Sequence, residues 1–413
     1  PTPQTTATPT TKPTATPSPT ASTEEPAKGP SENSKDAKNL KEIIAKQREA
    51  GALVSENLQS GEYMWDGDYL TGILWRWANL SGTLDLNCFD HLELVYCFEG
   101  QLNKLDVTKC TSLKELNCGI NQLSELDVTK CTSLKKLNCY GNQLSELDVT
   151  KCPSLEELSC GENQLSELDV TKCPSLKELV CNENQLSELD VTKNENLQEL
   201  DCSNMQPTGM KLASLDVSNC KNLRTLKCMS NQLTELDVTK CSSLEYLECE
   251  GNRLSGLDVT KCSSLETLGC YENQLSELDV TKCPSLGYLG CGDNQLSKLD
   301  VSMCPNLKDL FCDSNQLSEL DVTKCPSLEH LLCSDNQLSE LDVSKCSSLK
   351  TLWCSSNQLG ELDVTKCPSL EYLNCENNQL SKLELTNCTQ LTQLDCDPDV
   401  TVIGYTEKRV NMQ

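Results

Sequence analysis

The sequence has 413 residues, of which 29 are cysteine and only 4% are aromatic, and its formal net charge is −27. A chain this acidic lacks the clusters of Lys and Arg that nucleic acids and anionic membranes require, and it contains no apolar run of about 18 residues that could span a bilayer. Its length would suggest several globular domains and its cysteine content a disulfide scaffold, but the positions of the cysteines argue against both.

Residues 1–33 consist almost entirely of Pro, Thr, Ser and Ala. Such a segment cannot bury enough apolar surface to offset its ordering entropy, and its prolines keep it extended. We therefore expect a disordered Pro/Thr-rich linker, which is typical of secreted and wall-exposed proteins. Because the chain begins at Pro1 without a signal peptide, we expect a mature or truncated piece with a further domain upstream.

Residues 34–91 are predicted to form an N-terminal cap of helix, hairpin and degenerate repeat. Apolar residues at helical spacing follow Asp36, the candidate N-cap, and the run ends at Gly51. Asp66-Gly67 between apolar stretches predicts a hairpin turn. Tryptophans gather here, and we expect them to seal the open end of the structure that follows, with a binding role as the alternative. They are Trp65, Trp75 and Trp77.

Residues 92–396 repeat every 21 residues in about 15 units, followed by a predicted cap strand and tail at 397–413. The unit at 113–133 reads L-x-x-L-x-C-x-x-N-x-L-x-x-L-D-V-x-x-C-x-x. Its residues 116–118 alternate as in a short strand, and stacked units would place these strands in one parallel sheet. Asn121 at the turn is expected to bond its own and the next unit, forming an asparagine ladder. The rest of the unit is too short for a helix, so we expect extended chain or short strands on the back face.

The cysteines fall into two columns. Fifteen occupy the strand position of Cys118 and thirteen the turn position of Cys131, where Asn194 is the one gap; Cys88 belongs to neither. Neighbours in a column would have parallel side chains, which suits a disulfide poorly, and no C-x-x-C spacing is present for zinc. We therefore expect free structural thiols and no metal or other cofactor, with disulfides or a metal as the alternative.

The motif L-x-x-L-x-C-x-x-N-x-L is a leucine-rich-repeat pattern with Cys in its third apolar place. Over about residues 70–400, these 21-residue units resemble those of bacterial cell-surface proteins of the internalin class, in the cysteine-ladder form. The resemblance implies a curved leucine-rich-repeat solenoid with its parallel sheet on the concave face, in an extracellular or wall-associated bacterial protein used for adhesion or host-protein binding. The turn-column cysteine is an addition to that pattern, and no L-P-x-T-G wall-sorting motif follows the repeats.

The units differ mainly at the two outward places of the front strand, whereas the back half keeps Leu-Ser-Glu-Leu-Asp-Val-Thr-Lys. Large rings occupy the outward places only in the second half of the coil. Because grouped aromatic residues anchor interfaces, we predict a partner-binding patch there, with incidental drift among duplicated units as the alternative. Its candidate residues are Tyr246, Tyr288, Phe311, His330, Leu332, Trp353 and Tyr372.

Two other features have simpler interpretations. The columns of Asp and Glu on the back half predict a solvated face, and a calcium-binding carboxylate ladder is the alternative. Five extra residues within 203–212 predict a tolerated surface loop, or else a contact loop.

No nucleophile motif, phosphate loop or metal motif points to an enzyme. We therefore predict a monomeric extracellular module that binds an unidentified protein or host-surface ligand on its concave face, without contacting nucleic acid or entering a membrane. A rigid spacer or wall-coat element presenting an upstream domain is the first alternative. Glycan binding through the evenly spaced rings is the second.

Overall fold

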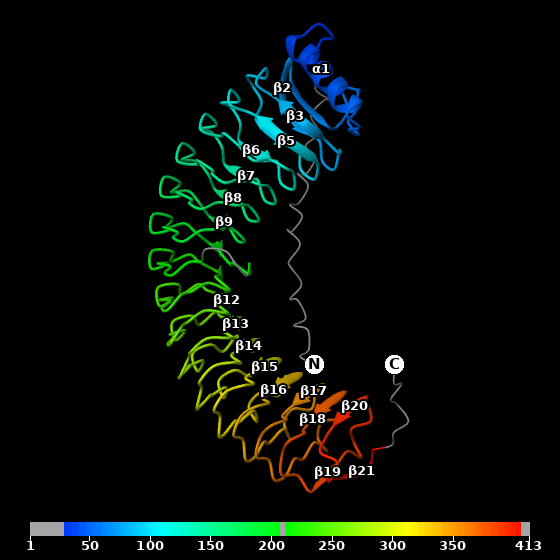
Figure 1. The fold of residues 1–413 in the computed structure, drawn as a ribbon, viewed down its shortest axis with the longest axis vertical. Coiled ribbons are helices and arrows are strands. Elements are labelled where there is room, and N and C mark those ends of the chain that lie inside the picture. The colour runs from blue at the N-terminus through cyan, green and yellow to red at the C-terminus, as the bar shows by residue number, and fades with distance from the viewer. Residues whose placement is uncertain (1–28, 207–210, 406–413) are drawn as a thin grey trace.

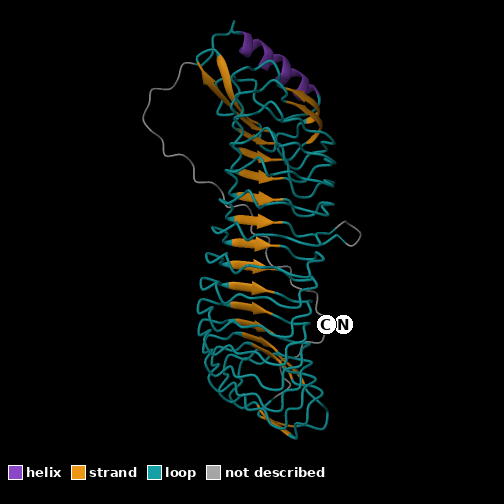
Figure 2. Cartoon of the chain, turned by 90° about the vertical axis from the view of Figure 1, so that its left-hand side faces the viewer, coloured by secondary structure: helices purple, strands orange, loops and turns teal. Residues whose placement is uncertain are grey.

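The computed structural model describes residues 29–206 and 211–405, so nearly all of the predicted linker and the end of the tail lie outside the described residues. Short strands stack one above another into a curved solenoid (Figure 1). They form a single row, with one helix covering the N-terminal end (Figure 2). The leucine-rich-repeat solenoid predicted from the 21-residue period is thereby confirmed.

Helix α1 (Lys35–Glu49) begins two residues earlier than the sequence suggested. Its N-cap is Ser34, whose hydroxyl accepts the Ala37 amide at 3.1 Å, so the prediction of Asp36 as the cap is wrong. Asp36 lies in the first turn, where its charge suits the helix dipole. Its carboxylate accepts the Leu70 amide at 2.9 Å and ties the helix to the first hairpin.

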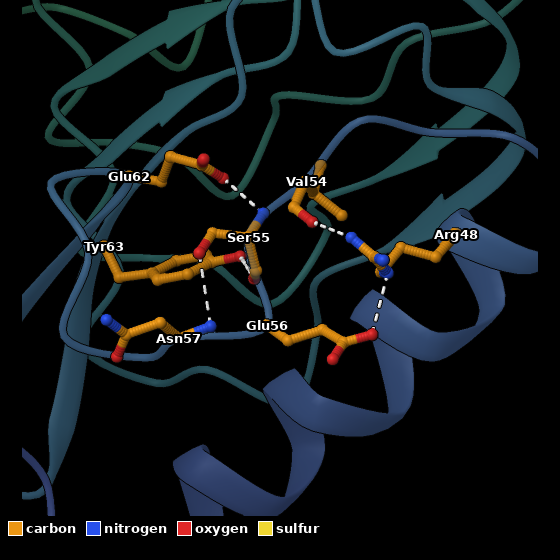
Figure 3. Close-up of polar contacts among 7 residues, drawn as sticks. All are labelled: Arg48, Val54, Ser55, Glu56, Asn57, Glu62 and Tyr63. Atoms are coloured by element: carbon orange, nitrogen blue, oxygen red, sulfur yellow. Dashed lines mark hydrogen bonds and ion pairs between the residues drawn. The ribbon is translucent and has the colours of Figure 1, made fainter.

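The loop between helix and hairpin is held by polar contacts (Figure 3). Arg48 donates to Val54 O at 2.8 Å, and the Tyr63 hydroxyl donates to Ser55 O at 2.6 Å. The amide of Ser55 in turn donates to the Glu62 carboxylate at 2.9 Å. These bonds give the irregular backbone of the cap the partners that a regular element would supply.

The predicted hairpin is formed by the antiparallel strands β1 (Tyr63–Asp66) and β2 (Tyr69–Leu74). Strand β2 then pairs in parallel with β4 (Leu94–Tyr96), so the degenerate repeat is the first turn of the coil. Trp75 is buried in this cap as expected. Trp77 is not: 64% of it is exposed, in a left-handed conformation with φ 53°.

The main sheet of the described residues has 17 strands, paired in parallel and in register except for the β1–β2 hairpin. Each central strand is three residues long and buries its middle leucine. The strands after β4 are β6 (Glu115–Asn117), β7 (Lys136–Asn138), β8 (Glu157–Ser159), β9 (Glu178–Val180), β10 (Glu199–Asp201), β11 (Thr225–Lys227), β12 (Tyr246–Glu248), β13 (Thr267–Gly269), β14 (Tyr288–Gly290), β15 (Asp309–Phe311), β16 (His330–Leu332), β17 (Thr351–Trp353), β18 (Tyr372–Asn374) and β20 (Gln393–Asp395).

Backbone hydrogen bonds join neighbouring central units along the strand and the turn that follows it, as far as the Gln143 amide, which donates to Leu123 O at 2.8 Å. The Cys118 amide donates to Asn138 O at 2.8 Å, and the Ile120 amide in the following turn donates to Tyr140 O at 2.7 Å. Across residues 123–134, and in the matching segments of the other central units described, no amide donates to the backbone of another unit. The front is therefore held at the strand spacing of about 4.8 Å while the back spreads, which places the sheet on the concave side (Figure 1).

The expected asparagine ladder is confirmed, but its bonds run to the preceding unit. Asn121 donates to Cys97 O at 2.9 Å and to Cys118 O at 3.0 Å, and its own oxygen accepts the Leu102 amide at 3.0 Å. The pattern recurs in later units, for example at Asn252. Each buried side chain thus satisfies turn groups that would otherwise lack partners.

The residue before each ladder asparagine turns the chain away from the sheet in a left-handed conformation. This residue is a glycine at Gly141 and Gly251, but in most units it is Glu, Asp, Ser or Asn. Ile120, with φ 53°, is a β-branched residue in this role, which is unfavourable because its Cβ crowds the backbone.

The back turns are joined by side chains instead. The Cys131 thiol lies 3.7 Å from Val107 O of the preceding unit, and the later turn cysteines repeat the contact. Where Asn194 fills the gap, its amide donates to Val170 O at 3.1 Å and to Cys173 O at 2.9 Å. All 29 cysteines are free thiols, and burial raises the pKa of Cys131 to about 12.

In the described residues, strands pair on the back only at the two ends of the coil. They are β3 (Ser81–Asp85) with β5 (Gln101–Asp106), and β19 (Lys382–Glu384) with β21 (Thr401–Ile403), both parallel. β21 lies in the predicted C-terminal cap. Near β21 the Asp397 carboxylate accepts the backbone amides of Asn377 at 2.8 Å and Asn378 at 3.1 Å. In the central units the equivalent amides donate to backbone carbonyls of the next unit, so Asp397 replaces the unit that would follow.

Candidate partner-binding face

The first and third residues of each central strand point outward from the concave face, so they form two rows across the sheet. We call these the first row and the second row. The register aligns Tyr246 with Thr267, and Thr267 with Tyr288, in the first row. The same alignment carries the second row from Phe311 to Leu332. All seven predicted site residues therefore lie on one face, as their spacing suggested.

The four predicted residues of the first row occupy alternate strands, about 9.6 Å apart by strand geometry. Tyr246 and Tyr372 are the most open, with exposed fractions of 41% and 43%. Tyr288 and His330 are half-buried. The Tyr246 hydroxyl donates to Glu266 at 3.1 Å, so even the open ring is held at its edge.

The second row carries the remaining three predicted residues on consecutive strands. Phe311, Leu332 and Trp353 are all half-buried. Phe311 meets Tyr288 edge to face, with ring centroids 5.5 Å apart and an interplanar angle of 86°, a favoured aromatic geometry. The structure thus brings one pair of the predicted rings into direct contact and spreads the others along the sheet.

His330 links neighbouring strands through polar contacts. Its Nδ1 lies 3.1 Å from Thr351 Oγ1, and its Nε2 lies 4.0 Å from a carboxylate oxygen of Asp309. Burial raises the pKa of Asp309, and the nearby imidazole partly offsets this. His330 is therefore held between β15 and β17 rather than projecting freely toward a partner.

The residue after each strand cysteine forms a third row, which the sequence analysis missed. Two of its members fold back over glycines of the following units. Glu250 covers Gly269, and the Tyr271 ring covers Gly290 and Gly292, such that a Cβ at Gly292 would lie 2.6 Å from the ring. The available signal was the variation of this position, from Gly119 to Tyr271, in an otherwise regular unit.

Several carboxyl groups on this face are shielded from water by their neighbours. Burial raises the pKa of Asp201 and Asp313, and it raises the pKa of Glu250 to about 7. Glu248 differs because Lys227 lies 3.0 Å away and neutralises it. The middle of the concave face is therefore acidic as well as aromatic.

A second aromatic group lies at the N-terminal end of the same face, outside the predicted patch. The expectation that large rings occupy the outward places only in the second half of the coil is therefore wrong, because Tyr96 is the outward third residue of β4. Trp77 meets Phe98 edge to face at 5.5 Å, and Phe98 lies 6.5 Å from Tyr96. The Arg76 guanidinium lies 4.8 Å from the centre of the Tyr96 ring, a cation–π distance. The prediction that the tryptophans only seal the coil is wrong for Trp77, because the turn that carries it lies outside the packed interior.

The back-face carboxylates are used locally. Asp127 accepts the amide of Thr129 at 2.9 Å and its hydroxyl at 2.7 Å, and later units repeat this turn. Across residues 29–206 and 211–405, no group of three or more His, Cys, Asp or Glu residues is placed to hold a metal ion. Each aspartate of the column thus stabilises the turn that follows it.

The insertion predicted at 203–212 lies between β10 and β11 in chain order, and its residues 207–210 lie outside the described part. Lys211 closes the insertion by donating to Ser230 O at 2.7 Å. In the part of the chain that the structure describes, no helix is long and apolar enough to cross a membrane.

Comparison with known proteins agrees with this architecture. A family model for leucine-rich repeats in two copies matches residues 132–172, 153–195 and 326–366. The functional domain of InlJ from Listeria monocytogenes, which includes a cysteine ladder, is 33% identical in sequence, with a TM-score of 0.72 over 78% of this chain and 70% of that one. The chain belongs to the internalin class of leucine-rich-repeat proteins.

Other bacterial solenoids share the fold of this internalin-class chain. A leucine-rich-repeat protein of Leptospira interrogans is 23% identical, with a TM-score of 0.65 over 79% of this chain and 89% of that one. The effector YopM from Yersinia pestis is 26% identical, with a TM-score of 0.61 over 79% and 88%. A comparison with curated proteins found no match. Leucine-rich-repeat solenoids typically mediate protein–protein interaction, and the matches indicate no catalytic family.

Proposed function

We propose that this internalin-class chain is an extracellular adhesion module of a bacterial cell surface, which binds a partner protein on its concave face as a monomer. The observation that carries the proposal is the gathering of Tyr288, Phe311 and the other predicted rings on that face, in register across β12 to β18. Large rings on an open sheet supply contact area at a small entropic cost and anchor interfaces.

The constant back face supports the same proposal. A rigid spacer has no reason to vary one face more than the other, whereas here the outward front positions change from unit to unit and the back does not. The spacer role nevertheless makes a clear alternative, since it requires no partner on either face.

Glycan binding is the second candidate function. The observation that favours it is the alternate-strand spacing of Tyr246, Tyr288, His330 and Tyr372, which suits the stacking of rings on an extended polysaccharide. The half-buried state of Tyr288 and His330 leaves only the two outer rings broadly open for such stacking.

The test is a fourfold alanine variant of Tyr288, Phe311, Trp353 and Tyr372. Its matched control replaces second-row residues of the first half of the coil by alanine, namely Asn117, Asn138, Ser159 and Val180. Both proteins are presented to cultured cells, immobilised mucin and a panel of polysaccharides, and their thermal unfolding is recorded.

We expect the aromatic variant to lose binding to cells or mucin while the control retains it. Loss confined to the polysaccharide panel would favour the glycan candidate. Equal binding by both folded variants would contradict the proposed function and support the spacer.

A further inference from the structure

The second row of the concave face has a gap at its centre. Gly269 on β13 and Gly290 on β14 are neighbours in register, whereas the other strands from β6 to β18 carry a side chain at this place. Two glycines side by side lower the surface of the sheet between Glu248 on β12 and Phe311 on β15. The gap is therefore bordered by a carboxylate on one side and an aromatic ring on the other.

The gap receives the carboxyl group of Glu250 and the ring of Tyr271 from the preceding turns. A Cβ on Gly269 would overlap Oε1 of Glu250, and a Cβ on Gly290 would overlap the edge of the Tyr271 ring. The glycines are thus needed for the two side chains to lie flat on the sheet. Tyr288 stands beside them, with its hydroxyl 3.0 Å from where a Cβ of Gly290 would be.

Burial of the Glu250 carboxyl group is only partly offset, by its own backbone amide and by the charge of Lys227. Within the described residues, its Oε2 is buried and has no hydrogen-bond partner. The nearest basic group, Lys227, is engaged with Glu248 at 3.0 Å. A buried carboxylate oxygen without a donor costs free energy that an incoming cation with N–H groups would recover.

The surroundings favour a cation in a second way. Tyr271, Tyr288 and Phe311 present aromatic rings around the same gap, and ring faces attract ammonium and guanidinium groups. The wider face adds the carboxyl groups of Asp309, next to His330, and of Asp313, next to Gly292, so a positive ligand is complemented on more than one side.

We propose that the floor which Glu250 and Tyr271 form over Gly269 and Gly290 is a docking site for a basic side chain, arginine before lysine, of the partner protein, with Glu250 as its ion-pair partner and Tyr288 beside it. Arginine is favoured because its planar guanidinium can pair with a carboxylate and stack on a ring together. The inference rests on the proposed function in that the concave face binds a protein, and it specifies an arginine-bearing segment as what binds there.

The test uses peptide probes and does not need the natural partner. Three peptides blocked at both ends are titrated into the full chain by calorimetry at pH 8: hexa-arginine, hexa-lysine and the uncharged analogue hexa-citrulline. An ionic strength of about 0.15 M suppresses unspecific electrostatic attraction. The variant Glu250→Gln keeps the size of the side chain and removes its charge. Glu146→Gln, an exposed back-face change, is the matched control.

We expect hexa-arginine to bind more tightly than hexa-lysine and hexa-citrulline not to bind. Glu250→Gln should weaken hexa-arginine by about tenfold, the worth of one charge-assisted hydrogen bond, and Glu146→Gln should leave it unchanged. Equal weakening by both variants, or none by either, would overturn the proposal. So would equal binding of hexa-citrulline.

The two proposals fail separately. If the fourfold alanine variant still binds cells or mucin, the proposed function is contradicted whatever the peptides do. If the peptide titration shows no role for Glu250 while the alanine variant loses its partner, the binding face stands and the basic docking site does not.

Discussion

The front half of each unit changes its outward residues from strand to strand, whereas the back half repeats nearly the same eight residues. The difference matches how each half is joined to its neighbours. Front strands are held by backbone groups, as between Cys118 and Asn138, and these bonds do not depend on outward side chains. Back turns are held by the side chains themselves, through thiols such as Cys131. A face joined by its backbone is free to vary, and a face joined by its side chains is not.

The largest expected effect comes from breaking the side-chain bonds of the front turn. Asn252→Ala removes the donor to Cys228 O and Cys249 O and the acceptor of the Leu233 amide. Leaving these groups buried without partners should lower the free energy of unfolding by about 3–5 kcal/mol. Cys262→Ala in the same unit loses only weak thiol contacts and a small volume, and should cost about 1–2 kcal/mol.

Chemical unfolding of both variants measures the difference. A cost at Cys262 equal to that at Asn252 would show that the thiols contribute as much as the amide ladder. The two halves of the unit would then differ only in the backbone hydrogen bonds that join the front strands.

Glu250→Gln tests whether the charge of an outward front residue lowers the free energy of unfolding. The folded protein raises the pKa of Glu250 from 4.5 to about 7, chiefly by burial, with Glu248 adding and Lys227 opposing. Folding therefore favours the protonated form of Glu250. The stability that this protonated carboxyl group contributes is fully present below pH 4.5 and is lost as the pH rises through about 7. Gln imitates the protonated form, so the variant should be more stable at pH 8 by about 1–3 kcal/mol and equal near pH 4.

Denaturant titrations at the two pH values check this sign. The charged and titratable groups that face Glu250 are Glu248 on β12, Lys227 on β11 and Tyr288 on β14, together with the buried thiols of Cys228, Cys249 and Cys270. A variant that is less stable than the natural protein at pH 8 would mean that the Glu250 charge is compensated inside the fold.

Ile120 offers a smaller gain in the front turn. Ile120→Asn replaces a β-branched residue that is strained in the left-handed conformation by a residue that tolerates it, as Asn377 does at the equivalent position. The variant should be more stable by about 1 kcal/mol. Because Ile120 is 51% exposed, little burial is lost. Ile120→Val keeps the branch at Cβ and should show no gain in the same thermal unfolding experiment, so equal gains would point to another cause.

The smallest effect is expected at the gap in the back column. Asn194→Cys exchanges a strong amide donor for a thiol, but it also removes a buried Oδ1 that has no hydrogen-bond partner in the described residues. The two changes oppose each other, so stability should shift by less than about 1 kcal/mol. A large loss on denaturant unfolding would indicate that Asn194 does more than stand in for a cysteine.

The fold could be predicted closely because the 21-residue period fixes which side chains stack. The ladder at Asn121 and the two columns of free thiols follow from repetition alone, and the strand predicted at 116–118 lies one residue earlier, at 115–117. The left-handed turns could not be seen, since Glu, Ser and Ile fill places where a sequence reader looks for glycine. The helix cap was misplaced because Asp36 and Ser34 are both good caps, and only the tertiary contact to Leu70 separates them.

The 21-residue period also predicts which of the candidate residues share one face of the sheet. Register placed Tyr246, Tyr288 and Phe311 on one face, because spacing decides which way a strand residue points. It could not show that Glu250 and Tyr271 fold over glycines of later units, since that contact depends on side-chain length and on open space rather than on period. The exposure of Trp77 was also hidden, because its turn lies at the irregular end of the coil.

A coil joined by its backbone along one side has an uneven resistance to bending. The sheet holds its length, so any change of curvature must occur by opening or closing the spaces between back turns such as those at Cys131 and Cys152. The paired strands β3 with β5 and β19 with β21 clamp the two ends and confine this compliance to the middle. A change in the curvature of the solenoid would therefore leave the spacing of its concave residues constant.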